Sequence, residues 1–315
     1  MFQIYVDSAA NLPAVDVKKY GIHVVSFVNY VNGEKSICFD GSLSPEEERA
    51  QGKKYYDAIR NGLEVKTSLV NMEDFAKAFE VALKAKEDIL YISLSKNISG
   101  TFNAAKLASE DLLEEYPDRK ICLVDSLNAS LGQGLLAVYG SMMRDKGVSV
   151  EETARILQDS VGKMNGVFTV GNLKYLARSG RIKNSAAVVG NVLSVKPILR
   201  GNKDGYIVQY KKVRGRKKSL DELINYVCDN IVEPEKQIIG IAHADAYEES
   251  LYITEEIKKR INIGGVINTS YDYCTGSHVG PEAIALFFIA DDRELEGKSD
   301  NHKTMELFDT IGSIY

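Results

Sequence analysis

The chain alternates short apolar runs with stretches of helical spacing, a pattern typical of strands that feed helices. In the first half, Phe2–Val6, Asp88–Leu94 and Lys120–Val124 are apolar runs that end in polar residues. Helical spacing follows over Ser99–Tyr116 and again, punctuated by glycines, beyond Ser126. Strand alternating with helix predicts an α/β domain built on a Rossmann-like, mostly parallel sheet.

Turn residues and helix-capping residues predict further elements in the first half of the chain. His23–Tyr30 is β-rich, and the Asn32-Gly33 pair that follows predicts a hairpin with Glu34–Cys38. Ser44-Pro45-Glu46-Glu47 combines an N-cap, a proline at the first helical position and a capping-box glutamate. We therefore predict a helix that runs from there to about residue 61.

The pattern changes after a second capping box, at Ser149-Val150-Glu151-Glu152. Gly201–Gly205 predicts a turn between strand-like Ile198–Arg200 and Tyr206–Val213, which implies antiparallel pairing. Further helices are predicted near Asn172–Arg178, Ser185–Val195 and Glu248–Arg260, and further strands at Gln237–Ala242, Val266–Tyr271 and Ala283–Ala290. We expect an α/β domain over residues 1–162, an α+β domain over 163–295 and a loosely attached tail over 296–315.

Charge and composition exclude several classes of function. The chain has 39 basic and 44 acidic residues, a net charge of −5 that disfavours nucleic acid as a partner. No apolar run reaches the ~18 residues of a membrane span and no signal peptide is evident, so we expect a cytoplasmic protein without an integral membrane segment. Four widely spaced cysteines and no His/Cys cluster indicate buried thiols and no metal site.

The segment Ser95–Thr101 joins the end of an apolar strand to the start of a helix. Ligands of open α/β sheets gather at this end of the strands, and the free amides of a helix N-terminus attract anions. Ser99 offers a hydroxyl there, and Gly100 permits close approach to the backbone. Spacing alone explains Ser99 equally well as a helix N-cap.

Two other segments carry polar groups suited to an anion. Thr67 and Ser68 lie between two predicted helices, where such a pair is more typical of a turn. His278 stands in a glycine-flanked stretch that we interpret as a loop presenting the side chain, and a nearby anion would favour its charged form. Asp7 and Asp125, each at the end of a predicted strand, are expected to accept turn amides.

Lys211–Lys218 is a dense basic run in an acidic chain. It predicts either a solvated strand end or a docking patch for phosphate or for an acidic partner. Nucleic acid is poorly supported, because no aromatic residues are interleaved with the basic ones.

Several short segments, in matching order from residue 1 to about residue 290, together resemble the DegV family of bacterial fatty-acid-binding proteins. They are Val6-Asp7-Ser8, Lys66-Thr67-Ser68, Ser95–Phe102, Asp125-Ser126, Leu173–Ile182, Val195–Leu199, Arg214–Arg216 and His278–Pro281.

The resemblance implies a two-domain protein that buries a palmitate- or oleate-like fatty acid and uses no cofactor. It places the carboxylate contacts on Thr67, Ser99 and His278, with Ser68 and Gly100 beside them. It also implies that a separate ATP-dependent fatty acid kinase subunit converts the bound acid to an acyl phosphate, and that Arg214 or Arg216 contributes to docking that kinase.

On this interpretation the protein is a carrier and not an enzyme. Apolar candidates for the cavity wall are Phe168, Val188, Val189, Val192, Leu193 and Leu199. The main alternative is a lipid esterase with Ser99 as nucleophile and His278 as base, although no GxSxG elbow surrounds Ser99. A regulatory protein that binds its partner through the basic run is a further alternative, which the acidic net charge disfavours.

Overall fold

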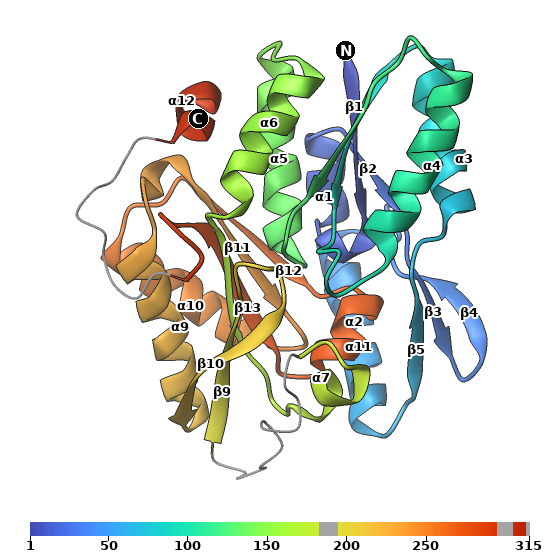
Figure 1. Cartoon of the computed structure of the whole chain (residues 1–315). Helices are drawn as coiled ribbons and strands as arrows, with labels where there is room; N and C mark the ends of the chain where they lie inside the picture. The colour runs from blue at the N-terminus through green and yellow to red at the C-terminus, as the bar shows by residue number, and fades with distance from the viewer. Residues whose placement is uncertain (183–194, 295–304, 313–315) are drawn as a thin grey trace.

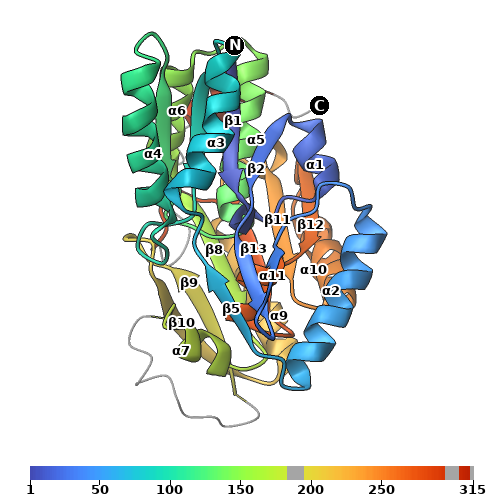
Figure 2. The same ribbon diagram turned by 90° about the vertical axis from the view of Figure 1, so that its right-hand side faces the viewer.

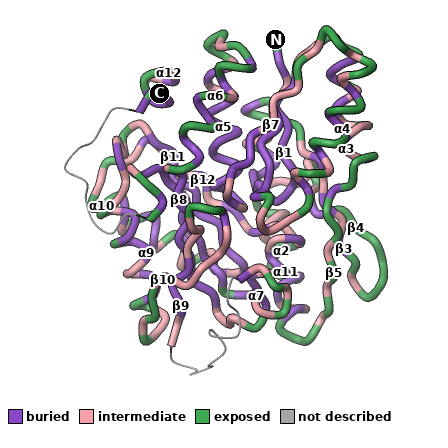
Figure 3. The backbone as a smooth tube through the Cα atoms, viewed as in Figure 1, coloured by how far each residue is buried: buried purple, intermediate pink, exposed green. Residues whose placement is uncertain are grey.

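The computed structural model describes residues 1–182, 195–294 and 305–312, which form two large sheets and one small sheet with helices between and around them (Figure 1). The helix predicted over Ser185–Val195 lies outside the described residues, except that Val195 begins a strand. Figure 3 shows that most of the central strands are buried, whereas the hairpin of the small sheet is largely exposed.

The first large sheet is entirely parallel, in the order β2-β1-β6-β7. Its strands are β1 (Phe2–Asp7), β2 (Ile22–Val25), β6 (Asp88–Ser93) and β7 (Ile121–Asp125). Tyr5 and Tyr91 face one helical layer while Ile4 and Leu90 face the other, because side chains alternate across a strand. The two layers are α3 (Met72–Lys84) with α4 (Thr101–Glu115), and α5 (Leu131–Asp145) with α6 (Val150–Val161). The predicted parallel α/β sheet is confirmed.

The second large sheet has the order β10-β9-β8-β13-β11-β12 and is antiparallel except between β11 and β12. Its strands are β8 (Met164–Thr169), β9 (Val195–Gly201), β10 (Ile207–Arg214), β11 (Ile238–His243), β12 (Gly265–Ser270) and β13 (Ile284–Ile289). One face packs against α9 (Arg216–Asn230) and α10 (Tyr247–Arg260). The other face packs against α5, so this helix lies between the two large sheets, with 12 of its 15 residues buried.

The small sheet corrects two expectations. His23–Tyr30 is not one strand: β2 joins the parallel sheet, while β3 (Val28–Val31) pairs with β4 (Glu34–Ile37) and β5 (Val65–Ser68). Thr67 and Ser68 therefore lie on a strand and not in a turn between helices. The hairpin at Asn32 and Gly33 is confirmed, with φ values of 52° and 89°.

The remaining elements lie around these sheets. They are α1 (Ala14–Lys19), α2 (Pro45–Arg60), α7 (Lys174–Ser179), α11 (Tyr273–Val279), α12 (Glu306–Ile311) and the 3₁₀ turns Ser8–Ala10 and Pro234–Lys236. The predicted capping box of α2 is formed, with Ser44 Oγ accepting from the Glu47 amide. Within the 296–315 segment, α12 packs against α5 and α6 and buries Leu307 and Phe308, so this described part is not detached.

His278 lies in the last turn of α11, so the prediction that it stands in a loop is wrong. The helix forms because the Asp272 side chain accepts the amide of Thr275 at its N-terminus, despite Gly276 in its middle. Figure 2 shows α11 beside β5, and a hydrogen bond joins the two elements.

Candidate functional site

A cavity of about 400 Å³ lies between the two large sheets and the small one, within the size range of small-molecule sites. Its walls come from β5, from the segments that follow β6 and β7, from the inner face of the second large sheet and from α11. Most of the lining is apolar: Phe27, Leu69, Leu94, Ile98, Leu127, Phe168, Leu176, Ile207, Val279 and Phe287. A largely apolar chamber with few polar groups suits an apolar ligand that has one polar end.

The ligand-binding residues predicted from the sequence all line this cavity. They are Thr67, Ser68, Ser99, Gly100 and His278. Thr67 Oγ1 lies 3.0 Å from His278 Nε2, which joins β5 to α11 across 211 residues of sequence. When Nε2 carries the imidazole proton and donates it to Thr67, the threonine O–H remains able to donate into the cavity.

Ser99 lies two residues before the first residue of α4 and lines the cavity. Its hydroxyl is 2.8 Å from Thr101 Oγ1 and accepts weakly from the Thr101 amide at 3.3 Å. Gly100 stands at the N-cap position without a side-chain cap, so Ser99 partly satisfies the helix terminus while it lines the cavity. A Cβ on Gly100 would lie 3.2 Å from the Leu69 side chain, which would have to shift by a few tenths of an ångström to admit it.

His278 is a neutral imidazole in this ligand-free structure. Burial, with the positive charges of Arg181 and Arg178 nearby, lowers the pKa of His278 to about 4. The expectation of a side chain presented rather than buried is therefore wrong, whereas the expectation that a nearby anion favours the charged imidazole stays a prediction. A carboxylate placed beside it would oppose both causes of the shift.

Two aspartates hold the loops that form the cavity rim, as predicted. Asp7 Oδ2 accepts from the Tyr91 hydroxyl at 2.8 Å and from the Leu94 amide at 3.0 Å, and burial raises its pKa. Asp125 Oδ1 accepts from the Leu127 amide at 3.1 Å. These bonds fix the chain where β6 and β7 end.

Sequence reasoning missed two arginines that line the cavity, Arg181 and Arg293. Arg181 also lines an outer cleft of about 430 Å³ with Lys66 and Arg178. Thr67 and His278 line both spaces, so this pair stands between the apolar cavity and the outer cleft, whose charged lining residues are Lys66, Arg178, Arg181 and Glu64. Arg181 belongs to the Leu173–Ile182 segment that carried part of the family resemblance, which was the available signal.

Of the residues predicted to form the apolar cavity wall, one is found there, one is not, and the others are not described. Phe168 lines the cavity, whereas Leu199 is buried in the core and is not among the lining residues. Val188, Val189, Val192 and Leu193 lie outside the described residues.

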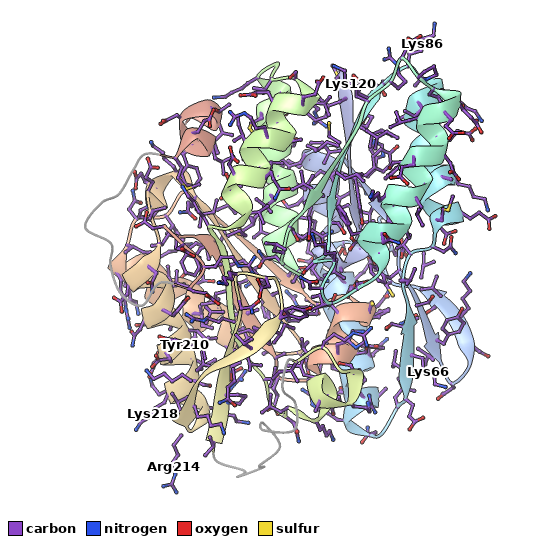
Figure 4. The ribbon with its side chains drawn as sticks, viewed as in Figure 1. Lys66, Lys86, Lys120, Tyr210, Arg214 and Lys218 are labelled. Carbon is purple, nitrogen blue, oxygen red and sulfur yellow. The ribbon has the colours of Figure 1, made fainter. Side chains whose placement is uncertain are left out.

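The basic run covers the end of β10 and the start of α9, and only part of it is available to a partner. Arg214 projects from the tip of β10 and makes no ion pair with any described residue (Figure 4). Arg216 is held by Glu249, with Nε 2.9 Å from Oε1. Lys211 pairs with Glu222 at 2.6 Å. Of the two arginines proposed for docking, the geometry therefore favours Arg214 alone.

The contacts of Ser99 and His278 do not support the esterase alternative. His278 bonds to Thr67 and Ser99 to Thr101, so the Ser–His pair that a nucleophile requires is not assembled among the described residues. Over residues 1–182, 195–294 and 305–312, no three His, Cys, Asp or Glu side chains are grouped to hold a metal ion. None of the helices in those ranges has both the length and the apolar character needed to cross a bilayer.

Comparisons with known proteins match most of this chain. The chain is 37% identical over 294 residues to the DegV domain-containing protein CPE0026 of Clostridium perfringens, covering 93% of this chain and 99% of the relative. A DegV lipid binding protein from Thermotoga maritima shares 28% identity at a TM-score of 0.80, covering 93% and 100% of the two chains.

A stearic acid-binding protein from Eubacterium ventriosum shares 26% identity at a TM-score of 0.80, covering 92% and 98%. The family model described as "Uncharacterised protein, DegV family" matches residues 1–291. The chain therefore belongs to the DegV family.

Proposed function

We propose that this protein is a carrier that buries one long-chain fatty acid and holds its carboxylate at the Thr67–His278 pair, with Ser99 beside it. The observation that carries the proposal is an apolar cavity that ends at a small hydroxyl and imidazole cluster. The solved relative from Eubacterium ventriosum, described as binding stearic acid, has the same fold and supports this choice of ligand.

The apolar and the polar lining residues contribute differently to the binding free energy of a fatty acid. Each buried methylene contributes ~0.8 kcal/mol, so the ~14 methylenes of a palmitate-like chain give on the order of 11 kcal/mol before costs. A hydrogen bond to the carboxylate adds only ~1.5–3 kcal/mol. Chain burial therefore supplies the affinity, and the polar cluster fixes which end of the ligand faces the entrance.

We propose that the outer cleft is the entrance to the cavity, which gives this orientation a purpose. Lys66, Arg178 and Arg181 line the cleft outside the Thr67–His278 pair, where incoming negative charge would be stabilised. The bound carboxylate is thus presented to a partner kinase, which transfers a phosphoryl group from ATP to give the acyl phosphate. The carrier contributes binding and orientation, and the kinase contributes the chemistry.

The direct test is the lipid content of the protein purified from a bacterial host. We expect about one fatty acid per chain, seen as a mass difference between native and denaturing mass spectrometry and identified after organic extraction. Delipidated protein should take up palmitate or oleate again. Repeated extraction without fatty acid, together with no uptake of either acid, would contradict the proposal.

Binding of a fatty acid should raise the pKa of His278. In the ligand-free protein its pKa of about 4 lies below the ordinary value, so the ring stays neutral from pH 5 to 7. A bound carboxylate favours the imidazolium, so its pKa should rise on loading. Titration of the ring nitrogens by nuclear magnetic resonance measures both states.

His243 is the internal control for this titration. Burial also lowers its pKa to about 4, but it lies on β11 and does not line the cavity. Its titration should be the same in both states. Equal shifts of the two histidines would indicate a general change in the protein and would count against carboxylate binding at His278.

A further inference from the structure

A second, smaller pocket of about 90 Å³ lies beside the apolar cavity. Tyr271 lines both spaces and so separates them. The walls of this acidic pocket come from three segments that are distant in sequence: the turn after β1, the stretch from the end of β4 into α2, and the end of β12 with the start of α11. The pocket has room for an ion with a few water molecules.

The lining of the acidic pocket carries negative charge without compensation. It includes the carboxylates of Asp40, Glu48 and Asp272, whereas no lysine, arginine or histidine is among the described residues that line it. The other polar side chains of the lining mostly carry hydroxyl or amide oxygens: Ser8, Asn11, Gln51, Thr269, Ser270, Tyr271 and Tyr273. Buried negative charge is unfavourable unless a positive charge accompanies it, so this lining indicates a cationic occupant.

Asn11 provides an observation that is independent of charge. Its side chain is 6% exposed and lines the acidic pocket, yet neither Nδ2 nor Oδ1 has a hydrogen-bond partner among the described residues. Asp272 lies beside it, and the buried Oδ2 of Asp272 likewise lacks a partner there. Unpaired polar atoms in a buried place are costly, and an occupant of the pocket would satisfy both side chains.

Asp272 connects the acidic pocket to the helix that carries His278. Its Oδ1 accepts the Thr275 amide at 2.5 Å and thereby caps α11. Asn11 directly follows the 3₁₀ turn at the end of β1, in the first large sheet. A ligand held by Asp272 and Asn11 together would fix the start of α11 against this sheet.

We infer that the acidic pocket binds a hard divalent cation, held directly by Asp272 Oδ2 and Asn11 Oδ1. This site goes beyond the proposed carrier function and does not depend on it. Because no three carboxylates of the described residues are grouped tightly enough to share one ion, Asp40 and Glu48 act through bound water.

The donor set distinguishes between possible cations. Carboxylate and amide oxygens from three separate segments form an irregular set, which Ca²⁺ accepts, whereas Mg²⁺ demands near-octahedral geometry. Zn²⁺ prefers sulfur and imidazole ligands. Cys38 is the one sulfur-bearing side chain beside Cys-free segments of the lining, and no histidine accompanies it among the described residues. We therefore expect a preference for Ca²⁺.

The test is cation binding to full-length, delipidated protein from which metals have been removed with a chelator that is then dialysed away. We expect calorimetry to show about one Ca²⁺ per chain, bound at least about tenfold more tightly than Mg²⁺. The midpoint of thermal unfolding should rise with Ca²⁺ concentration, because the cation binds only the folded chain. Binding of neither Ca²⁺ nor Mg²⁺ would overturn the inference and leave the carrier function intact. Tighter binding of Zn²⁺ than of Ca²⁺ would overturn the assignment to a hard cation.

Two variants test the proposed ligands. Asp272→Asn keeps a capping oxygen for α11 and removes the charge. Asn11→Gly suits the left-handed backbone at this position, φ 54°, and removes the amide oxygen. Each variant should bind Ca²⁺ at least about tenfold more weakly than the wild type, while circular dichroism shows that it is folded.

Glu73→Gln is the control for the loss of one negative charge. Glu73 is an exposed residue of α3 that does not line the acidic pocket. This variant should bind Ca²⁺ as the wild type does. Unchanged affinity in both Asp272→Asn and Asn11→Gly, or an equal loss in the control, would overturn the assignment of the cation to this pocket.

Discussion

Gly276→Ala is expected to lower the free energy of unfolding by about 2–4 kcal/mol, through overpacking and one lost hydrogen bond. A Cβ at Gly276 would collide with the hydroxyl of Tyr56, which is fully buried. That hydroxyl donates to the Tyr271 carbonyl at 3.0 Å and ties α2 to the start of α11. Displacing it should also move His278, two residues further on, so the retained lipid should decrease. Chemical denaturation and lipid extraction measure the two effects.

Gly162→Ala is the matched control for this substitution. Gly162 ends α6 with φ −66°, an ordinary helical value, and no atom lies within 4 Å of the Cβ it would gain. Its effect should stay within about 0.5 kcal/mol, because a compatible Gly→Ala change mainly reduces the freedom of the unfolded chain. Similar losses in both variants would show that the contact with Tyr56 is not the cause.

Charge reversal at Arg214 and at Arg216 should have different consequences, although the two residues are neighbours in sequence. Arg214 is exposed, so Arg214→Glu should leave stability and lipid content unchanged. If the proposed kinase docks there, the substitution should lower acyl-phosphate formation about tenfold at low salt, because a charge at the rim of an interface acts mainly on the rate of encounter. Acyl-phosphate formation with the wild-type protein should itself fall as salt rises, since salt screens charges beyond ~8 Å at physiological ionic strength.

Arg216→Glu should instead destabilise the fold. It would place a second carboxylate against Glu249 in a half-buried position, which is expected to cost about 1–3 kcal/mol. Kinase-coupled turnover measured against salt, with thermal unfolding in parallel, separates the two variants. Unchanged turnover for Arg214→Glu would contradict a docking role and would indicate that the basic run is only a solvated strand end.

Local signals were sufficient for most of the fold. The central strands β1 and β6 of the parallel sheet are buried on both faces and are nearly continuous apolar runs, and the helix caps depend on residues three positions apart. The split of His23–Tyr30 into two strands was not predictable in this way. Its two halves are both β-rich, and only pairing with β1 on one side and β5 on the other separates them.

The candidate site was predictable only in part. The resemblance named Thr67, Ser99 and His278, and the cavity lining brings these residues together, but their contacts depend on distant packing. The glycines around His278 suggested a loop, whereas the Asp272 cap and the contact with α2 make a helix. The Arg216–Glu249 pair and the burial of Arg293 likewise arise from residues far apart in sequence. Such contacts leave no periodic signal along the chain.

The position of α5 between the two large sheets has a consequence for the order in which the protein matures. During synthesis, α5 leaves the ribosome long before β8, β11 and β13, which cover one of its sides. α12 arrives later still, and Phe308 then packs edge-on against Tyr139 of α5, with ring centroids 6.0 Å apart. A nascent chain that has completed only the parallel sheet therefore exposes an apolar helix face. Until the second large sheet has been made, that face is a site for chaperone binding or for premature association.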